Sequence, residues 1–407
     1  MAGLNPTCIL GLAVFLSTGT VLANDLFNPG IFTKSAGGAG LTQSRGAETI
    51  LHNPANLDRS KGHQVYYEVD VTRMDYRYVP MEAGVDEANL NLLVPPAFVG
   101  WSWADSTFSA GALVIPDGVG TEMKVDGVPV QQGTVMEVFD TKAIRTGYRF
   151  GLGGGARINP WLTIGLAAVY QYQREEIEGS KDDIVEMDAE LEGSGMRYHA
   201  GARLTPLADL TLGLHYSPAA TRESDANILL NESTAPYISQ AVVYYPEAWG
   251  LGLEYTLGRL GLFAETGLEK HSAGRGKART GYPGEPLVSD LRDVQHYSVG
   301  AWLQILSNQR LTVGYENRRG NRGNGRYEKD TNGFNSITVS GGGQFGDFAA
   351  MDRTSWSGGY LVETGGWDLN LLGSYTRATK LVPDDAPGAG GYEYQMYVFG
   401  IGGLKEI

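Results

Sequence analysis

The sequence predicts an all-β fold, a 14-stranded antiparallel transmembrane β-barrel with an N-terminal hatch (plug) inside its lumen. Three observations predict it. Residues 143–172 contain two long runs in which apolar and polar side chains alternate. Short and long connections then alternate along the chain, as they do in outer-membrane barrels. The composition includes 57 Gly, 22 Tyr and 7 Trp, with few long helical runs.

The two runs in 143–172 define the repeating unit. In the first, Tyr148, Phe150 and Leu152 alternate with Arg149 and Gly151. After a break at residues 158–160 the same alternation resumes and continues to residue 172. Strands of about ten or more residues are long for a soluble sheet but suit a tilted crossing of a bilayer. We therefore expect the apolar face to meet lipid and the arginine-bearing face to line the lumen.

Before the first strand come two segments of different character. Residues 1–23 have a short apolar core and a small-residue cleavage site before Asn24, as in a secretory signal peptide. The only cysteine, Cys8, lies in this segment, so the mature chain would have no disulfides and no thiolate metal site. Residues 24–63 show no alternation and are rich in glycine, and we expect them to form a folded hatch. Residues 64–407 would form the barrel.

Twelve further strands are expected around the hairpin of residues 143–172. The turns after every second strand are short, whereas the other connections are long. In a soluble β-sandwich there is no reason for every long loop to lie at one end. Residues 335–345 are assigned to a loop, because a fifteenth strand would break the alternation of short and long connections. The twelve strands are expected at residues 64–78, 97–103, 107–115, 195–204, 210–221, 247–257, 260–269, 295–306, 310–318, 355–364, 367–379 and 392–403.

At this point the chain resembles the FadL family of outer-membrane transporters of long-chain fatty acids and other hydrophobic compounds. The resemblance rests on the glycine-rich start with Asn53-Pro54-Ala55, on residues 246–249 (PEAW), and on Asp352-Arg353 before Trp356. It implies that outer loops catch the ligand and that the hatch lines its pocket, which would include Asn53, Pro54 and Ala55. It also implies lateral release into the membrane at a kink in the third strand.

The third predicted strand runs into Pro116-Asp117-Gly118. Proline lacks an N–H for the ladder and glycine permits an unusual backbone, so this tripeptide is the candidate lateral gate. The same three residues are also typical of a turn that simply opens the next loop.

The connection after the fifth strand is acidic, with nine carboxylates and one lysine in residues 175–192. Apolar residues within it favour a short amphipathic helix, and three more follow the seventh strand. They would form an outer-loop groove for the ligand, or they would only pack against neighbouring loops. The acidity disfavours a fatty carboxylate and suits a neutral ligand or divalent cations that bridge to lipopolysaccharide. The groove candidates are Ile184, Val185, Met187, Leu191, Ile228, Leu229 and Leu230.

Cationic side chains are expected on the lumenal face of the fourth and sixth strands. They are candidates for binding a ligand carboxylate. The alternative is structural, in which they pair with Glu48 or Asp58 of the hatch or with Glu68 and Asp70 of the wall. The candidates are Arg145, Arg149, Arg197, His199 and Arg203.

Several functions are disfavoured by the sequence. A formal net charge of −14 argues against nucleic acid as a partner. The six histidines do not have the spacing of metal ligands, so no metal site is expected. Residues 151–156 resemble a dinucleotide-binding motif but lack the helix that should follow it, so no cofactor is expected. No nucleophile elbow occurs, and no enzyme activity is expected. An outer-membrane lipid hydrolase would need a Ser/His pair near the interface, and none is found.

The sequence thus favours a monomeric transporter in the outer membrane of a Gram-negative bacterium, in contact with its lipid and lipopolysaccharide. Its ligand would be a long-chain fatty acid or another hydrophobic compound, which the sequence does not name. The alternative is a non-transporting surface barrel with an adhesin or structural role.

Overall fold

The computed structural model describes most of the barrel and the segment before it. The described residues are 30–60, 62–80, 88–94, 97–116, 121–132, 135–181, 184–230, 240–274, 279–281, 287–320, 322–329, 339–340, 351–382 and 390–407. The predicted signal peptide and the first residues of the predicted hatch lie outside these ranges.

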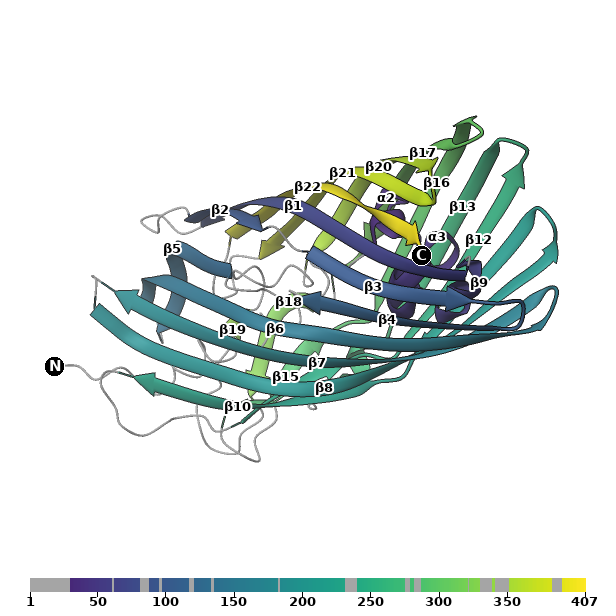
Figure 1. Cartoon of the computed structure of the whole chain (residues 1–407). Coiled ribbons are helices and arrows are strands. Elements are labelled where there is room, and N and C mark those ends of the chain that lie inside the picture. The colour runs from purple at the N-terminus through teal and green to yellow at the C-terminus, as the bar shows by residue number, and fades with distance from the viewer. Residues whose placement is uncertain are drawn as a thin grey trace.

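Fourteen antiparallel strands close into a barrel, as the alternation predicted (Figure 1). Each strand pairs with the next, and the last strand pairs with the first over Gln64–Pro80 and Gly390–Glu406. In barrel order the strands are β1 (Gly62–Pro80), β3 (Ala97–Ala104), β4 (Phe108–Pro116), β6 (Val135–Asn159), β7 (Leu162–Lys181), β8 (Ile184–Leu207), β9 (Leu210–Ser217), β12 (Ala248–Leu257), β13 (Leu260–Glu269), β16 (Val294–Leu306), β17 (Gln309–Arg318), β20 (Asp352–Thr364), β21 (Trp367–Val382) and β22 (Gly390–Glu406).

Short turns join β3 to β4, β6 to β7, β8 to β9, β12 to β13, β16 to β17 and β20 to β21, all at one end of the barrel. In barrels of this class that end faces the periplasm, so the opposite end is called the outer end below. Several strands continue beyond the barrel there. They are β2 (Ala88–Val94), β5 (Thr121–Gln132), β10 (Ala220–Leu230), β11 (Gln240–Tyr245) and β14 (Arg279–Gly281), while β15 (Leu287–Leu291), β18 (Arg322–Lys329) and β19 (Val339–Ser340) form a separate small sheet. A 3-10 turn, η3 (His271–Gly274), follows β13.

The acidic segment corrects one expectation. Residues 184–191, for which a short helix was expected, are strand, because β7 extends to Lys181 and β8 begins at Ile184. Ladder pairs such as Glu176↔Glu190 and Ile177↔Ala189 continue the barrel hairpin outward. The backbone hydrogen bonds of the paired strands outweigh the helical spacing of a few apolar residues.

The outward face of the barrel is apolar and carries aromatic rings in bands. Exposed leucines and valines alternate with buried polar residues along the strands. Near the outer end a chain of rings on five successive strands runs through Tyr297, Tyr315, Trp356, Tyr375 and Tyr397, with ring centroids 5.1–6.3 Å apart. Further rings continue this band over β6, β7, β9 and β12, and the opposite end carries its own aromatic contacts, Tyr67 with Trp367 and His63 with Trp101. Two aromatic bands around an apolar belt are typical of a barrel that spans a bilayer.

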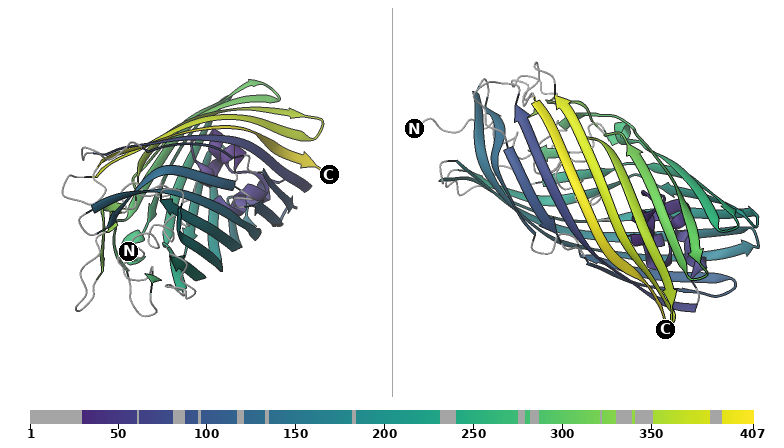
Figure 2. Two further views of the ribbon diagram at one scale, coloured as in Figure 1. Left: turned by 90° about the vertical axis from the view of Figure 1, so that its left-hand side faces the viewer. Right: turned by 90° about the horizontal axis from the view of Figure 1, so that it is seen from above.

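The hatch occupies the periplasmic half of the lumen. Its short helices are α2 (Ile31–Ser35), α3 (Gly40–Gln43), η1 (Gly46–Glu48), α4 (Thr49–His52) and η2 (Pro54–Arg59). Figure 2 shows them inside the ring of strands. Most of their side chains are buried, although no helix in the described part of the chain is long and apolar enough to cross a membrane.

Glycines on the lumenal face of the wall make room for the hatch. A Cβ added at Gly213 would lie 2.5 Å from the Leu41 carbonyl oxygen, and one at Gly165 would overlap the Pro54 backbone. Gly314 and Gly359 similarly face Ala36 and Ser35. Glycine permits this close approach of two backbones because it has no side chain. The high glycine content therefore has a specific packing role.

One sector of the wall lacks part of its ladder. β3 and β4 pair only from Ala104↔Ser109 to Val99↔Val114. Beyond Val99, β2 continues alongside β1, and beyond Pro116, β5 continues alongside β6. Among the described residues no ladder pair joins β2 to β5 at the outer end (Figure 1), although the two strands lie beside each other there.

Candidate functional site

A cavity of about 310 Å³ lies in the lumen on the outer side of the hatch. The hatch contributes Thr33, Lys34, Leu41 and His52 to its lining, and the wall contributes side chains from most sides of the barrel. The wall residues are strongly polar and include Arg149, Gln171, Arg197, His199, His215, Glu265, Glu269, His296, Glu316, Arg318 and Arg353. The cavity therefore offers charged and hydrogen-bonding groups as well as a few apolar surfaces.

Several of these charges already neutralise one another. Arg318 Nη2 lies 2.7 Å from Glu269, which also contacts His271 Nε2 at 2.9 Å. Arg353 lies 3.8 Å from Glu316. The carboxylates of Glu269 on β13 and Glu316 on β17 are thus matched by arginines on β17 and β20.

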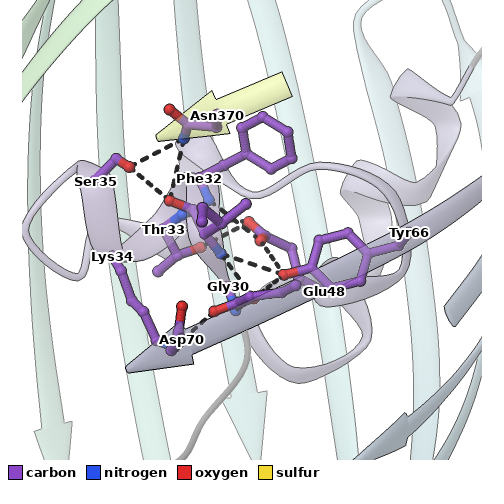
Figure 3. Close-up of polar contacts among 11 residues, drawn as sticks. Gly30, Phe32, Thr33, Lys34, Ser35, Glu48, Tyr66, Asp70 and Asn370 are labelled. Carbon is purple, nitrogen blue, oxygen red and sulfur yellow. Dashed lines mark hydrogen bonds and ion pairs between the residues drawn. The ribbon is translucent and has the colours of Figure 1, made fainter. Parts of the chain in front are cut away.

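The floor of the cavity is fixed by ionic contacts between α2 and β1 (Figure 3). Lys34 Nζ lies 2.6 Å from Glu68 and also pairs with Asp70. Glu68 in turn accepts hydrogen bonds from the Gly30 and Ile31 amides at 2.8 and 3.1 Å. Although burial lowers the pKa of Lys34, the two carboxylates hold that pKa above its ordinary value. The start of the described hatch is therefore held on the first strand of the barrel.

Glu48 connects two parts of the hatch, α2 and η1, with the wall. Its carboxylate accepts hydrogen bonds from the Thr33 hydroxyl at 3.0 Å, the Tyr66 hydroxyl at 3.2 Å and the Arg45 amide at 3.3 Å. Burial, together with the nearby charge of Glu68, raises the pKa of Glu48 to about 8, although the hydrogen bonds act in the opposite direction. Docking the hatch therefore favours the protonated form of Glu48.

The Asn53-Pro54-Ala55 motif has a clear place in the hatch. Asn53 accepts a hydrogen bond from the Ala55 amide at 3.2 Å and donates to the carbonyls of Leu41 and Ala202 at 3.1 and 3.2 Å. Pro54 begins η2, where proline loses no intrahelical bond, and packs against Gly165. The motif joins two hatch helices to β8, and none of its three residues lines the cavity described above.

The structure separates the five candidate cations. Arg149, Arg197 and His199 line the cavity. Arg203 instead faces the hatch, where it pairs with Asp58 at 2.5 Å. The side chain of Arg145 lies outside the described part of the chain.

Histidines gather in the cavity as well. His199 Nδ1 and His215 Nε2 are 3.1 Å apart, and the two rings are stacked. His52 of the hatch and His296 of β16 line the same cavity. In the described part of the chain no group of three or more His, Cys, Asp or Glu side chains is arranged to hold a metal ion.

Residues not singled out from the sequence extend the polar surface toward the outer end. The Tyr245 hydroxyl donates to Gln171 Oε1 at 3.0 Å, Gln171 Nε2 lies 3.5 Å from Gln173 Oε1, and Arg222 Nη1 donates to Gln173 Oε1 at 2.6 Å. The Arg197 guanidinium lies over the Tyr245 ring, 4.9 Å from its centroid. Gln171 and Gln173 alternate with the outward-facing Tyr170 and Tyr172, so the period of two could have placed both glutamines in the lumen. Arg222 lies just beyond the predicted seventh strand, so this pattern did not reach it.

Two predicted sites fall partly outside the described residues. Pro116 is the last residue of β4 and pairs with Tyr148, but Asp117 and Gly118 are not described. The groove residues on 184–191 and 228–230 are described only as backbone. There Leu191 pairs with Ala226, and Ile228, Leu229 and Leu230 pair with Ala189, Asp188 and Met187. The two groove segments are thus neighbouring strands.

Comparison with known proteins identifies the fold. No protein-family model matches the chain, and no curated protein matches it. Among solved structures, a Pseudomonas aeruginosa FadL homologue is 14% identical, with a TM-score of 0.63 over 92% of this chain and 98% of that one. The Ralstonia pickettii toluene transporter TbuX is 12% identical, with a TM-score of 0.61 over 94% and 99%. The Pseudomonas putida toluene transporter TodX is 11% identical, with a TM-score of 0.62 over 93% and 98%. The chain thus has the FadL-type fold that the resemblance in its sequence implied.

Proposed function

We propose that this chain is an outer-membrane transporter that takes up hydrophobic small molecules through a hatch-plugged barrel and releases them sideways into the membrane. The proposal draws on the shared fold, because two of the similar structures are described as toluene transporters. It is also favoured by the arrangement of hatch, cavity and wall in this chain. It places the protein in the outer membrane of a Gram-negative bacterium, after removal of residues 1–23.

The observation that carries the proposal is that the hydrogen-bonded ladder between β3 and β4 ends early. It ends on the outer side of the hatch, which fills the lumen. A ligand in the cavity meets a floor held by Lys34, Glu68 and Asp70, so the direct route to the periplasm is closed. The ladder between β3 and β4 ends at Val99↔Val114, and the outer aromatic band includes no described ring on β3 or β4 at the level of Tyr148. Release at this sector, next to Pro116-Asp117-Gly118, would spare a hydrophobic ligand a passage through water.

Long-chain fatty acids are the ligand class that we propose. Arg149, Arg197 and His199 line the cavity, where a guanidinium can bind a carboxylate. In this scheme the strands that carry Ile184, Val185, Met187 and Leu191 and residues 228–230 receive the ligand at the outer end. Asn53, Pro54 and Ala55 act by holding the hatch in place.

Uptake by cells that lack their own transporters tests the proposal. Cells that express the intact chain should accumulate labelled oleate or toluene, and removal of residues 30–60 should open the lumen to polar solutes and abolish selectivity. A non-transporting surface barrel, the alternative considered above, predicts no accumulation of either compound. Failure of the intact, correctly assembled barrel to accumulate any hydrophobic compound would overturn the proposal.

A further inference from the structure

A row of polar residues crosses four neighbouring strands at the outer edge of the cavity. Arg149 of β6 pairs with Gln171 of β7, and Gln171 pairs with Gly195 of β8. A Cβ at Gly195 would lie 3.1 Å from Cβ of Arg222 on β10, so Arg222 lies directly over this glycine. Its guanidinium reaches back toward β7, where Nη1 donates to Gln173 Oε1 at 2.6 Å. Together with Arg197 and Tyr245, these residues are called the arginine cluster.

Burial makes the cluster unusual. Arg222 and Gln173 are each 2% exposed, yet Arg222 Nε and Gln173 Nε2 have no hydrogen-bond acceptor. A buried donor without an acceptor is destabilising, so native structures rarely retain one without a reason. Both unsatisfied groups are N–H donors.

The acceptors within the cluster are already in use. Gln173 Oε1 accepts from Arg222, and Gln171 Oε1 accepts from the Tyr245 hydroxyl. Arg197 contacts the face of the Tyr245 ring, which offers no lone pair. Within the ranges that the structure describes, no ion pair joins Arg197 or Arg222 to a carboxylate. The cluster is therefore positively charged and has an excess of donors, and a group with several acceptor oxygens would complement it.

The number and origin of the donors indicate the class of that group. A hydrocarbon offers no acceptor, and a planar carboxylate offers two oxygens that one guanidinium can satisfy. Here the donors come from β7, β8 and β10, so they approach a bound group from different strands. A tetrahedral oxyanion presents three oxygens in different directions, and a phosphate monoester also carries a charge of about −1.5 to −2, which suits two guanidinium groups without carboxylate partners.

We propose that the arginine cluster binds the tetrahedral oxyanion head group of an amphiphile, a phosphate or sulfate monoester or a sulfonate. This inference rests on the proposed transport function and extends its ligands beyond fatty acids and hydrocarbons. The head group would lie against Arg197, Arg222 and Gln173, and the alkyl tail would extend toward the apolar side chains Val169, Met396 and Val398 of the cavity.

Calorimetric titration of the purified full barrel in a neutral detergent tests the proposal. The probes are octyl phosphate, octanoate, octanol and inorganic phosphate, each also titrated into empty micelles. Octyl phosphate should bind more tightly than octanoate, and Arg222→Gln should weaken its binding by about tenfold to a hundredfold. Octanol binding should be unchanged in this variant, since octanol has no charged head group.

The remaining outcomes separate the two proposals. Equal binding of octanoate and octyl phosphate, or an unchanged affinity in Arg222→Gln, would overturn the oxyanion inference while octanol binding still supported hydrophobic transport. Binding of inorganic phosphate with the same dependence on Arg222 would support the oxyanion site and assign it to a free anion. Arg222→Lys, which keeps the charge, should retain part of the affinity, and the heat-dependent gel mobility of each variant verifies the folded barrel.

Discussion

The hatch residue Asp58 forms an ion pair with Arg203 of β8, in which Arg203 Nη2 donates to Asp58 Oδ2 at 2.6 Å and Nη1 lies 2.5 Å from Oδ1. The same carboxylate accepts from the Thr163 hydroxyl at 2.8 Å and from Arg157 at 3.2 Å. One hatch carboxylate thus contacts the three successive wall strands β6, β7 and β8, whereas Lys34 contacts β1. A hatch held at both ends explains how so short a segment can plug the lumen.

Breaking this pair should loosen the hatch. Asp58→Asn leaves Arg203 without its charged partner in a mostly buried place, and loss of one member of a buried ion pair costs about 3–5 kcal/mol. A reporter, Thr42→Cys, would show the change, because Thr42 is buried and the only natural cysteine lies in the predicted signal peptide. Maleimide labelling of this reporter should accelerate in Asp58→Asn. Labelling at the original rate would show that the pair does not hold the hatch.

Glycine substitutions should act only where the hatch touches the wall. Gly165→Ala would place a methyl group into the Pro54 backbone and displace η2, whereas a Cβ at Gly373 has no neighbour within 4 Å. Overpacking of this kind typically costs about 1–3 kcal/mol. We expect ionic conductance in planar bilayers to rise for Gly165→Ala and to stay at the original level for Gly373→Ala. Equal conductance of the two variants would contradict the packing role of the wall glycines.

Closing the interrupted sector should reduce release of ligand. Pro116 pairs with Tyr148 and Thr121 with Arg145, so four residues of the sequence separate Pro116 from Thr121, whereas two residues of β6 separate Arg145 from Tyr148. Deletion of residues 119 and 120 would let β4 run into β5 in register and with the same faces. Uptake of labelled oleate should fall although ligand binding in detergent persists. The control is a deletion of two residues from 384–387, and normal uptake in both deletions would argue against a gate at this sector.

Hatch docking should depend on pH through Glu48. Its pKa is about 8 in the docked hatch, above the ordinary value of 4.5, so docking takes up a proton between these values. The stabilisation is complete below pH 4.5, declines as the pH rises toward 8 and is then constant. Labelling of the Thr42→Cys reporter should accelerate over this window. Glu48→Gln should flatten the profile, and a profile that is unchanged in this variant would assign the dependence to other groups.

A substitution in the motif Asn53-Pro54-Ala55 should perturb the hatch more mildly. Asn53→Ala removes hydrogen bonds to Leu41, Ala55 and Ala202, each worth about 0.5–1.5 kcal/mol. Oleate binding in detergent should weaken because the cavity floor shifts, although Asn53 does not line the cavity. The hydrogen-bonded barrel wall should keep its thermal stability. Unchanged oleate binding would indicate that the cavity does not depend on this part of the hatch.

The barrel was predictable from the sequence because membrane strands must alternate. Tyr148, Phe150 and Leu152 face lipid, and their neighbours face the lumen, so a period of two locates each strand without further information. The outward extension of β7 and β8 was missed because a strand above the membrane has no apolar face to reveal it. Its acidic residues have the composition of a solvated loop, although they form ladder pairs between β7 and β8.

The site was less predictable because sequence fixes the face of a residue but not its depth. Arg149 and Arg203 share the lumenal face, yet one lines the cavity and the other holds Asp58 of the hatch. Alternation alone cannot separate these roles, since the position of the hatch along the axis comes from its packing against wall glycines. The hatch itself has no periodicity, so its own contacts could not be derived.

The closure of β22 on β1 has a consequence for biogenesis. The hatch ends at Arg59 and β1 begins at Gly62, so the plug and the first strand are made together and well before the last strand. Lys34 pairs with Glu68 and Asp70 on β1. The hatch can therefore stay bound to that strand while the other strands assemble around it. Pairing of residues 64–80 with residues 390–406 then closes the barrel around a hatch that is already bound to β1.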